Sequence, residues 1–103
     1  MKTKTVGYCR VSTSTQDISI EAQQEKIKQY ADTYDMQIDE FVIDNGCSGK
    51  DLNRPGMQRL ITEPNITGII FHKLDRLTRS VKDLGYLLDG PFKGKQIVSV
   101  NEK

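Results

Sequence analysis

The alternation of short apolar runs with amphipathic segments restricts the fold of this chain more than any other feature. Runs rich in β-branched and aromatic residues lie at residues 5–11, 37–44, 67–72 and 96–101, and apolar residues at helical spacing separate them. Parallel neighbouring strands need crossover connections, which are usually helices. We therefore predict a single α/β domain with three layers, αβα, around a central, mainly parallel sheet.

The predicted helices have recognisable ends. Ser19 is a suitable N-cap for the first helix, which we expect to run to about Asp35. A second helix starts near Asn53, and a third follows residues 75–79 and stops at Gly90. The helical apolar pattern is carried by Ile20, Ile27, Tyr30, Ala31 and Tyr34 in the first helix and by Val81, Leu84, Leu87 and Leu88 in the third.

Charge and cysteine content exclude several classes of protein. The formal net charge is only +1, so the chain lacks the whole-surface positive field of proteins that bind nucleic acid without specificity. Two cysteines, Cys9 and Cys47, and the lack of an apolar leader indicate neither secretion nor a disulfide framework. No stretch reaches the length of a membrane span. We expect a cytoplasmic protein without membrane association.

The arginines are placed more selectively than the lysines. Four of the five arginines fall in the segments 8–12, 46–54 and 73–79, whereas the ten lysines are scattered. Each segment follows a predicted strand, and the loops at the carboxyl ends of parallel strands gather at one edge, where ligands bind. A planar guanidinium matches a phosphate group. We therefore predict an anion site at this edge, formed by Arg10, Arg54, Arg76 and Arg79.

Ser12 is the candidate nucleophile at the same edge. It begins a loop two residues after Arg10, and the other arginines converge on it from neighbouring strand ends. Phosphoryl transfer to serine depends on in-line geometry and on neutralised phosphate oxygens more than on a conventional triad. The residues do not identify the group that takes the serine proton, because a guanidinium is too basic and Asp75 can equally orient its neighbours.

Most of these polar residues also have a purely structural interpretation. Arg10 shares a strand face with apolar residues and could form an ion pair with Asp75. Arg76 and Arg79 lie on one face if their segment is helical, but they could equally form a solvated helix start capped by Asp75. Gln23 lies on the buried stripe of its helix, where its amide could bind a substrate oxygen or satisfy a loop backbone group.

Other kinds of site have little support. The only histidine, His72, lies inside a predicted strand, where we expect a packed neutral imidazole instead of a catalytic base. Cys9, Cys47 and His72 lack metal-ligand spacing, carboxylates do not cluster, and neither common glycine-rich phosphate loop occurs. We expect no metal and no cofactor.

Four motifs follow one another along nearly the whole chain. They are Tyr8-Cys9-Arg10-Val11-Ser12-Thr13, then Ser19-Ile20-Glu21-Ala22-Gln23, then Gly46-Cys47-Ser48-Gly49 with Asn53-Arg54-Pro55-Gly56-Met57, then Lys73-Leu74-Asp75-Arg76-Leu77-Thr78-Arg79. Together they resemble the resolvase/invertase family of serine site-specific recombinases. The order, the spacing and the strand-end positions all fit. The resemblance implies a resolvase-like catalytic domain.

The resemblance also implies a mechanism and a set of roles. Ser12 would attack a DNA backbone phosphate, form a 5′-phosphoserine link and free a 3′-hydroxyl, without metal or ATP. The implied partners are double-stranded DNA at a specific recombination site and further copies of the protein, in dimers and tetramers. By the same resemblance, Arg10, Arg76 and Arg79 would contact the scissile phosphate, Arg54 and Asp75 would complete the site, and Tyr8, Gln23 and Ser48 would support it.

The resemblance bears on domain organisation as well. In the family the catalytic domain continues into further helices, including one that dimerises, so we expect residues 1–103 to be a catalytic domain truncated at its C-terminal end. The interval from Ser12 to Gln23 and the motif at residues 53–57 favour the large integrase and transposase branch.

Two other interpretations stay open: a non-catalytic phosphate-binding or interaction domain of flavodoxin-like architecture, and a truncated relic that performs no reaction.

Overall fold

A four-stranded, entirely parallel sheet forms the centre of the molecule. The computed structural model describes residues 2–12, 18–47 and 52–101. The strands are β1 (Lys4–Val11), β2 (Glu40–Asn45), β3 (Ile66–Phe71) and β4 (Gln96–Ser99), in the order β2-β1-β3-β4. All four predicted strands are present, although β2 begins three residues later than expected.

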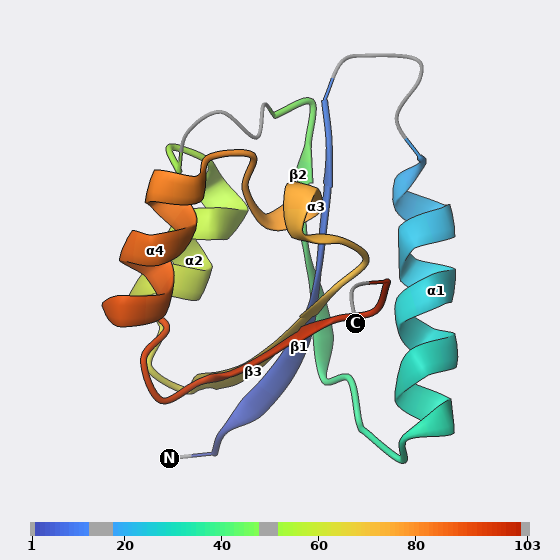
Figure 1. The fold of residues 1–103 in the computed structure, drawn as a ribbon. Coiled ribbons are helices and arrows are strands. Elements are labelled where there is room, and N and C mark those ends of the chain that lie inside the picture. Colours follow the sequence, from blue (N-terminus) through green and yellow to red (C-terminus); the bar gives the residue numbers. More distant parts are fainter. Residues whose placement is uncertain (1, 13–17, 48–51, 102–103) are drawn as a thin grey trace.

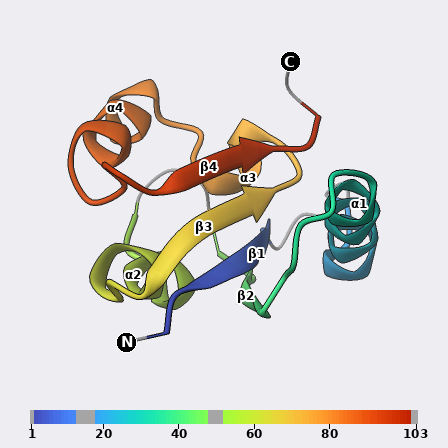
Figure 2. The same cartoon turned by 90° about the horizontal axis from the view of Figure 1, so that it is seen from below.

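Helices cover both faces of the sheet, as Figures 1 and 2 show. Helix α1 (Ile20–Thr33) lies on one face, and α2 (Pro55–Thr62) and α4 (Val81–Asp89) lie on the other. The single turn α3 (Leu74–Leu77) follows the carboxyl end of β3. The predicted three-layer αβα architecture is confirmed. Ser19 caps α1 as expected, since its Oγ accepts a hydrogen bond from the Ala22 amide at 3.1 Å.

The alternation of side chains along β1 divides the core between the two faces. Val6 and Tyr8 pack among the larger apolar cluster on the α2 and α4 side, while Cys9 packs with Ile27 and Ile70 beneath α1. All five side chains are fully buried. The same alternation directs Arg10 to the side of Val6 and Tyr8, as the sequence predicted.

Three apolar residues of the predicted helical pattern are not core residues. Tyr34 is 62% exposed because α1 ends at Thr33, and its ring lies against Tyr30 with centroids 4.5 Å apart. Val81, the first residue of α4, and Leu88 are also exposed. Helical spacing identified these helices but assigned too many of their apolar residues to the buried side. Within the described ranges, no helix combines the length and the apolar character needed to cross a bilayer.

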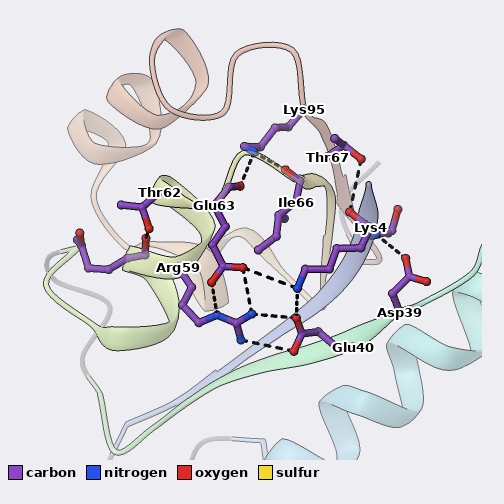
Figure 3. Close-up of polar contacts among 11 residues, drawn as sticks. Lys4, Asp39, Glu40, Arg59, Thr62, Glu63, Ile66, Thr67 and Lys95 are labelled. Carbon is purple, nitrogen blue, oxygen red and sulfur yellow. Dashed lines mark hydrogen bonds and ion pairs between the residues drawn. The ribbon is translucent and has the colours of Figure 1, made fainter. Parts of the chain in front are cut away.

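An ionic cluster ties the amino ends of β1 and β2 to the carboxyl end of α2 (Figure 3). Lys4 Nζ lies 2.5 Å from Glu40 Oε1, and Arg59 lies 2.9 Å from the same oxygen and 2.7 Å from Glu63 Oε2. The hydrogen bonds from Arg59 and Lys4 lower the pKa of Glu40 to about 2. The cluster lies at the opposite end of the sheet from the predicted site, so it contributes to stability and not to the chemistry.

Candidate active site at the carboxyl edge of the sheet

The strand order places β1 at the point where the connections change sides. The crossover from β1 to β2 contains α1 on one face, and the crossover from β2 to β3 contains α2 on the other. In open parallel sheets, ligands bind beyond the carboxyl ends of the strands at such a point. Ser12 follows β1, and α3 follows β3. The predicted site therefore lies where this architecture favours ligand binding.

Arg10 is fully buried, and its guanidinium binds three backbone carbonyls. Nε donates to Arg76 O at 3.1 Å, Nη1 to Cys47 O at 2.9 Å and Nη2 to Asp75 O at 2.7 Å. The suggested ion pair between Arg10 and the Asp75 carboxylate is therefore wrong, because Arg10 binds the main chain of Asp75. Arg10 thereby joins the end of β1 to the loop after β2 and to α3.

Gln23 faces inward, as predicted, and binds the main chain. Its Oε1 accepts from Arg10 N at 3.2 Å, and its Nε2 donates to Arg10 O at 2.9 Å and to Ile18 O at 3.0 Å. The pairing of β1 with β3 ends at Tyr8, so no residue of β3 binds the main chain of Arg10. The Gln23 side-chain amide forms the hydrogen bonds that a neighbouring strand would otherwise form. Both amide hydrogens are used, which supports the backbone interpretation of Gln23 and not the substrate interpretation.

Arg54 belongs to a buried network that sequence reasoning only partly identified. Arg54 Nη1 donates to the Tyr8 hydroxyl at 2.7 Å, and that hydroxyl donates to Asp44 Oδ2 at 2.6 Å. Arg54 Nη2 donates to Leu77 O at 2.7 Å, which joins α2 to the end of α3. Burial raises the pKa of the Tyr8 phenol; the Arg54 charge opposes this rise, and the hydrogen bond to Asp44 adds to it. Tyr8 therefore stays protonated and donates to Asp44.

Asp44 is the site residue that the sequence analysis missed. Its carboxylate also accepts from Gly56 N at 2.7 Å and Met57 N at 3.0 Å, so it binds the amino end of α2. A Cβ at Gly56 would lie 2.8 Å from Asp44 Oδ2, which explains the glycine. The available signal was position: Asp44 ends the apolar run of β2 and pairs in register with Arg10.

Arg76 and Arg79 do not share a helical face, contrary to one interpretation of their spacing. Helix α3 ends at Leu77, and the extended Thr78 separates it from Arg79. Arg76 is buried, with Nη1 3.3 Å from Arg10 O and Nε 3.2 Å from Asp75 Oδ1, whereas Arg79 is exposed. Asp75 lies inside the turn and does not cap it, because Lys73 occupies the N-cap position.

Ser12 is partly exposed at the end of β1, and the main chain before it is fixed. Val11 O accepts hydrogen bonds from Gly46 N at 2.8 Å and Cys47 N at 3.1 Å. Gln23 and Arg76 bind the main chain of Arg10. Ser12 is thus presented from an anchored strand end. Ser48, the remaining predicted site residue, lies outside the described residues.

The electrostatics of this edge favour an anion. Burial and the charges of Arg76 and Arg54 lower the pKa of Arg10. Burial opposes ionisation of Asp75, but the hydrogen bond and charge of Arg76, with the charges of Lys73 and Arg79, keep its pKa below the ordinary value. A groove of about 510 Å³ borders α3 and the start of α4, lined by Lys73, Leu74, Asp75, Thr78, Arg79, Ser80, Val81 and Leu84.

Three other residues considered from the sequence are the histidine and the two cysteines. His72 is 5% exposed, and burial together with the charges of Lys26 and Lys73 lowers its pKa, so it is a packed neutral imidazole. Cys9 is a buried free thiol whose pKa burial raises to about 12, and Cys47 is free and partly exposed. His72 therefore gives no support to a catalytic triad, and the two free cysteines give none to a disulfide.

The model of the family described as resolvase, N-terminal domain, matches residues 5–103. The chain belongs to this family. It is therefore a serine recombinase catalytic domain, of the class that cleaves and rejoins DNA in site-specific recombination, as the motifs predicted. The DNA-invertase hin of Salmonella typhimurium is 36% identical to it over 85 residues. That match covers 82% of this chain and 40% of the invertase, so the chain spans less than half of this relative.

Solved structures agree with the assignment. The N-terminal catalytic domain of TP901-1 integrase is 39% identical, with a TM-score of 0.84, over 95% of this chain and 77% of that domain. The catalytic domain of ISC1926 TnpA, an IS607-like serine recombinase, is 27% identical, with a TM-score of 0.78, over 96% and 68% of the two chains. The predicted fold is confirmed, whereas the assignment to the integrase and transposase branch stays a prediction.

Proposed function

We propose that Ser12 is the nucleophile of this recombinase domain. Its Oγ attacks a DNA backbone phosphorus, an Oγ–P bond forms, and the bond from phosphorus to the 3′-oxygen breaks. The serine gives up its proton, and the departing oxygen gains one to become a 3′-hydroxyl. The DNA is left joined to the protein by a 5′-phosphoserine, and rejoining reverses these steps.

The concentration of guanidinium groups around the end of β1 is the observation that carries this proposal. Arg10, Arg54 and Arg76 are buried together, with Asp44 and Asp75 as their carboxylate neighbours, and Arg79 adds an exposed charge. Positive charge therefore exceeds negative charge in this group. Such preorganised donors stabilise the charge of a phosphoryl-transfer transition state. We propose that Arg10, Arg76 and Arg79 neutralise the scissile phosphate.

The remaining residues position this machinery. Arg54 binds both the Tyr8 hydroxyl in the core and the Leu77 carbonyl at the end of α3. Gln23 binds the main chain of Arg10. A fixed strand end next to fixed arginines supplies the alignment that in-line attack requires. In this proposal Arg54 and Asp75 complete the site, and Ser48, which lies outside the described residues, keeps the supporting role that the resemblance implies.

We propose double-stranded DNA at a specific recombination site as the substrate, acted on by dimers and tetramers of the intact protein. Relatives named as invertase and integrase support a DNA substrate. The net charge of +1 supports local recognition instead of binding through the whole surface.

The test is covalent capture of labelled recombination-site DNA by the intact protein that carries this domain. Wild type forms a complex that survives denaturant and disappears on protease treatment. Ser12→Ala still binds the DNA but forms none. Ser99→Ala is the matched control, because Ser99 Oγ is buried without a hydrogen-bond partner among the described residues. Normal cleavage by Ser12→Ala disproves the proposal.

The arginine roles have a separate test in the same assay. Arg79→Ala should reduce covalent complex by about 10²-fold, the size of effect seen when one donor to a transition-state charge is removed. Arg59→Ala is the control, since Arg59 lies in the ionic cluster at the far end of the sheet. Equal effects of the two substitutions would remove Arg79 from the site.

A further inference from the structure

Residues 78–80 connect α3 to α4 and contain Arg79, the exposed arginine of the proposed phosphate site (Figure 1). Arg10 and Arg76 are buried and held by hydrogen bonds to backbone carbonyls. The position of an exposed guanidinium depends more on the main chain that bears it. Burial and the charge of Arg76 lower the pKa of Arg10 most, and the charge of Arg79 adds to this effect. The charge of Arg79 therefore acts on the end of β1, where Ser12 lies.

Hydrogen bonds anchor the chain on both sides of Arg79. Before it, Thr78 ends α3, and its amide donates to Leu74 O at 2.9 Å. After it, Ser80 is the N-cap of α4, and its Oγ accepts from Asp83 N at 3.1 Å. Arg79 is thus the single residue between two anchored ends. The direction of its side chain depends on how these two ends are joined.

The Thr78 side chain joins the two ends directly. Its Oγ1 accepts a hydrogen bond from Ser80 N at 3.1 Å, so this bond spans Arg79. Thr78 is only 5% exposed, and a β-branched side chain has few rotamers, so its oxygen is held in a fixed place. The backbone of Thr78 is extended, with φ −160° and ψ 151°, a conformation open to any residue. The hydroxyl, and not the backbone, therefore explains a threonine here.

We propose that Thr78 is a positioning residue for Arg79, whose main chain it fixes so that the guanidinium meets the scissile phosphate. The inference deepens the proposed function and rests on it, because it takes Arg79 as a phosphate ligand. Thr78, Arg79 and Ser80 all line the groove of about 510 Å³ beside α3, so this turn faces the open side of the site. Phosphoryl transfer needs its charge-neutralising groups in a narrow geometry, which a loose turn would not maintain.

Covalent capture of DNA by the intact protein at saturating DNA tests the proposal. Thr78→Val is close in shape but lacks the acceptor oxygen. It should slow formation of the covalent complex by about tenfold with DNA affinity unchanged, since a small misplacement of a catalytic group costs at least that much. Thr78→Ser keeps the oxygen and should stay within about threefold of wild type. Thr62→Val is the control, because it removes a hydroxyl that binds Gln58 O within α2.

A double-mutant cycle separates positioning from a general effect on the fold. In an Arg79→Ala background, Thr78→Val should slow the reaction by less than about twofold, because the group that Thr78 positions is gone. A residue that only stabilised the fold would lower the rate by the same factor in both backgrounds. Thr78→Ala removes the same oxygen without adding a methyl group in its place, so it should behave as Thr78→Val does.

Amide hydrogen exchange of the 103-residue chain examines the turn without DNA. Thr78→Val and Thr78→Ala should speed exchange of the Ser80 amide, Thr78→Ser should not, and the amides of β1 and β3 should exchange as in wild type. Wild-type cleavage by Thr78→Val, an equal loss in both backgrounds, or unchanged exchange at Ser80 would each overturn the proposal. Ser12→Ala, assayed beside these variants, tests the nucleophile separately, because the coupling of Thr78 to Arg79 is measured on the covalent complex whichever residue forms it.

Discussion

Arg10 and Arg76 each donate a guanidinium hydrogen bond to the other's backbone carbonyl. Arg10 Nε lies 3.1 Å from Arg76 O, and Arg76 Nη1 lies 3.3 Å from Arg10 O. The two like charges are therefore held together by the main chain between them. This reciprocal contact joins the end of β1 to α3, which fixes the relative position of the residues on either side of the proposed phosphate site.

Arg10→Lys should lower the free energy of unfolding by about 2–3 kcal/mol, because an ammonium group cannot reach the three separate carbonyls that the guanidinium binds. Urea denaturation of the purified chain measures this. Arg79→Lys is the matched control and should cost less than about 0.5 kcal/mol, since Arg79 is exposed. A similar loss of unfolding free energy in both variants would show that the carbonyl contacts of Arg10 add nothing to stability.

Asp44→Asn should destabilise the chain by about 3 kcal/mol. The carboxylate accepts hydrogen bonds from Tyr8 and from the Gly56 and Met57 amides, and a carboxamide would turn an NH₂ group toward these donors. Tyr8→Phe should cost about 1–2 kcal/mol. A double-mutant cycle by chemical denaturation should give a coupling of at least about 1 kcal/mol, and strict additivity would argue against a connected network.

Stability should fall in acid partly through Glu40. Its folded pKa, about 2, lies below the ordinary value of 4.5, so its contribution is present above pH 4.5 and is lost as the pH falls toward 2. The side chain is about one-third exposed, so we expect only about 1 kcal/mol, which salt reduces further. Glu40→Gln should flatten the stability curve between pH 5 and 2, which urea denaturation over a pH series measures.

Two glycines should respond oppositely to alanine. At Gly7 a Cβ would lie 2.5 Å from Phe41 Cε1 and 3.3 Å from Ile27 Cγ2, so Gly7→Ala should destabilise by about 1–3 kcal/mol. At Gly85 the space is open and the backbone helical, so Gly85→Ala should stabilise the monomer by about 0.5–1 kcal/mol. Thermal unfolding of both variants at low concentration decides whether the signs differ as expected.

The sequence predicted the elements and the edge where the site lies, but not how its charges are paired. Strand-end position identified Arg10, Arg54 and Arg76, because topology alone brings the ends of parallel strands together. The sequence could not show that Arg10 binds backbone carbonyls, because every residue has one and residue type does not reveal which of them accepts a hydrogen bond. Asp44 was missed for a related reason: a single carboxylate at a strand end resembles an ordinary turn residue until the amide groups of Gly56 and Met57 are placed beside it.

The early end of β3 has a consequence for how this domain can vary. Pairing of β3 with β1 stops at Phe71 and Tyr8, and the chain turns away into α3. If the same register continued for two more residues, Lys73 would lie opposite Arg10, and the strand would displace the side chains of Gln23 and Arg76 from the main chain of Arg10. The point at which β3 ends therefore decides which groups bind the main chain of Arg10, and extending that strand toward this edge should do more harm than lengthening a connection at the far end of the sheet.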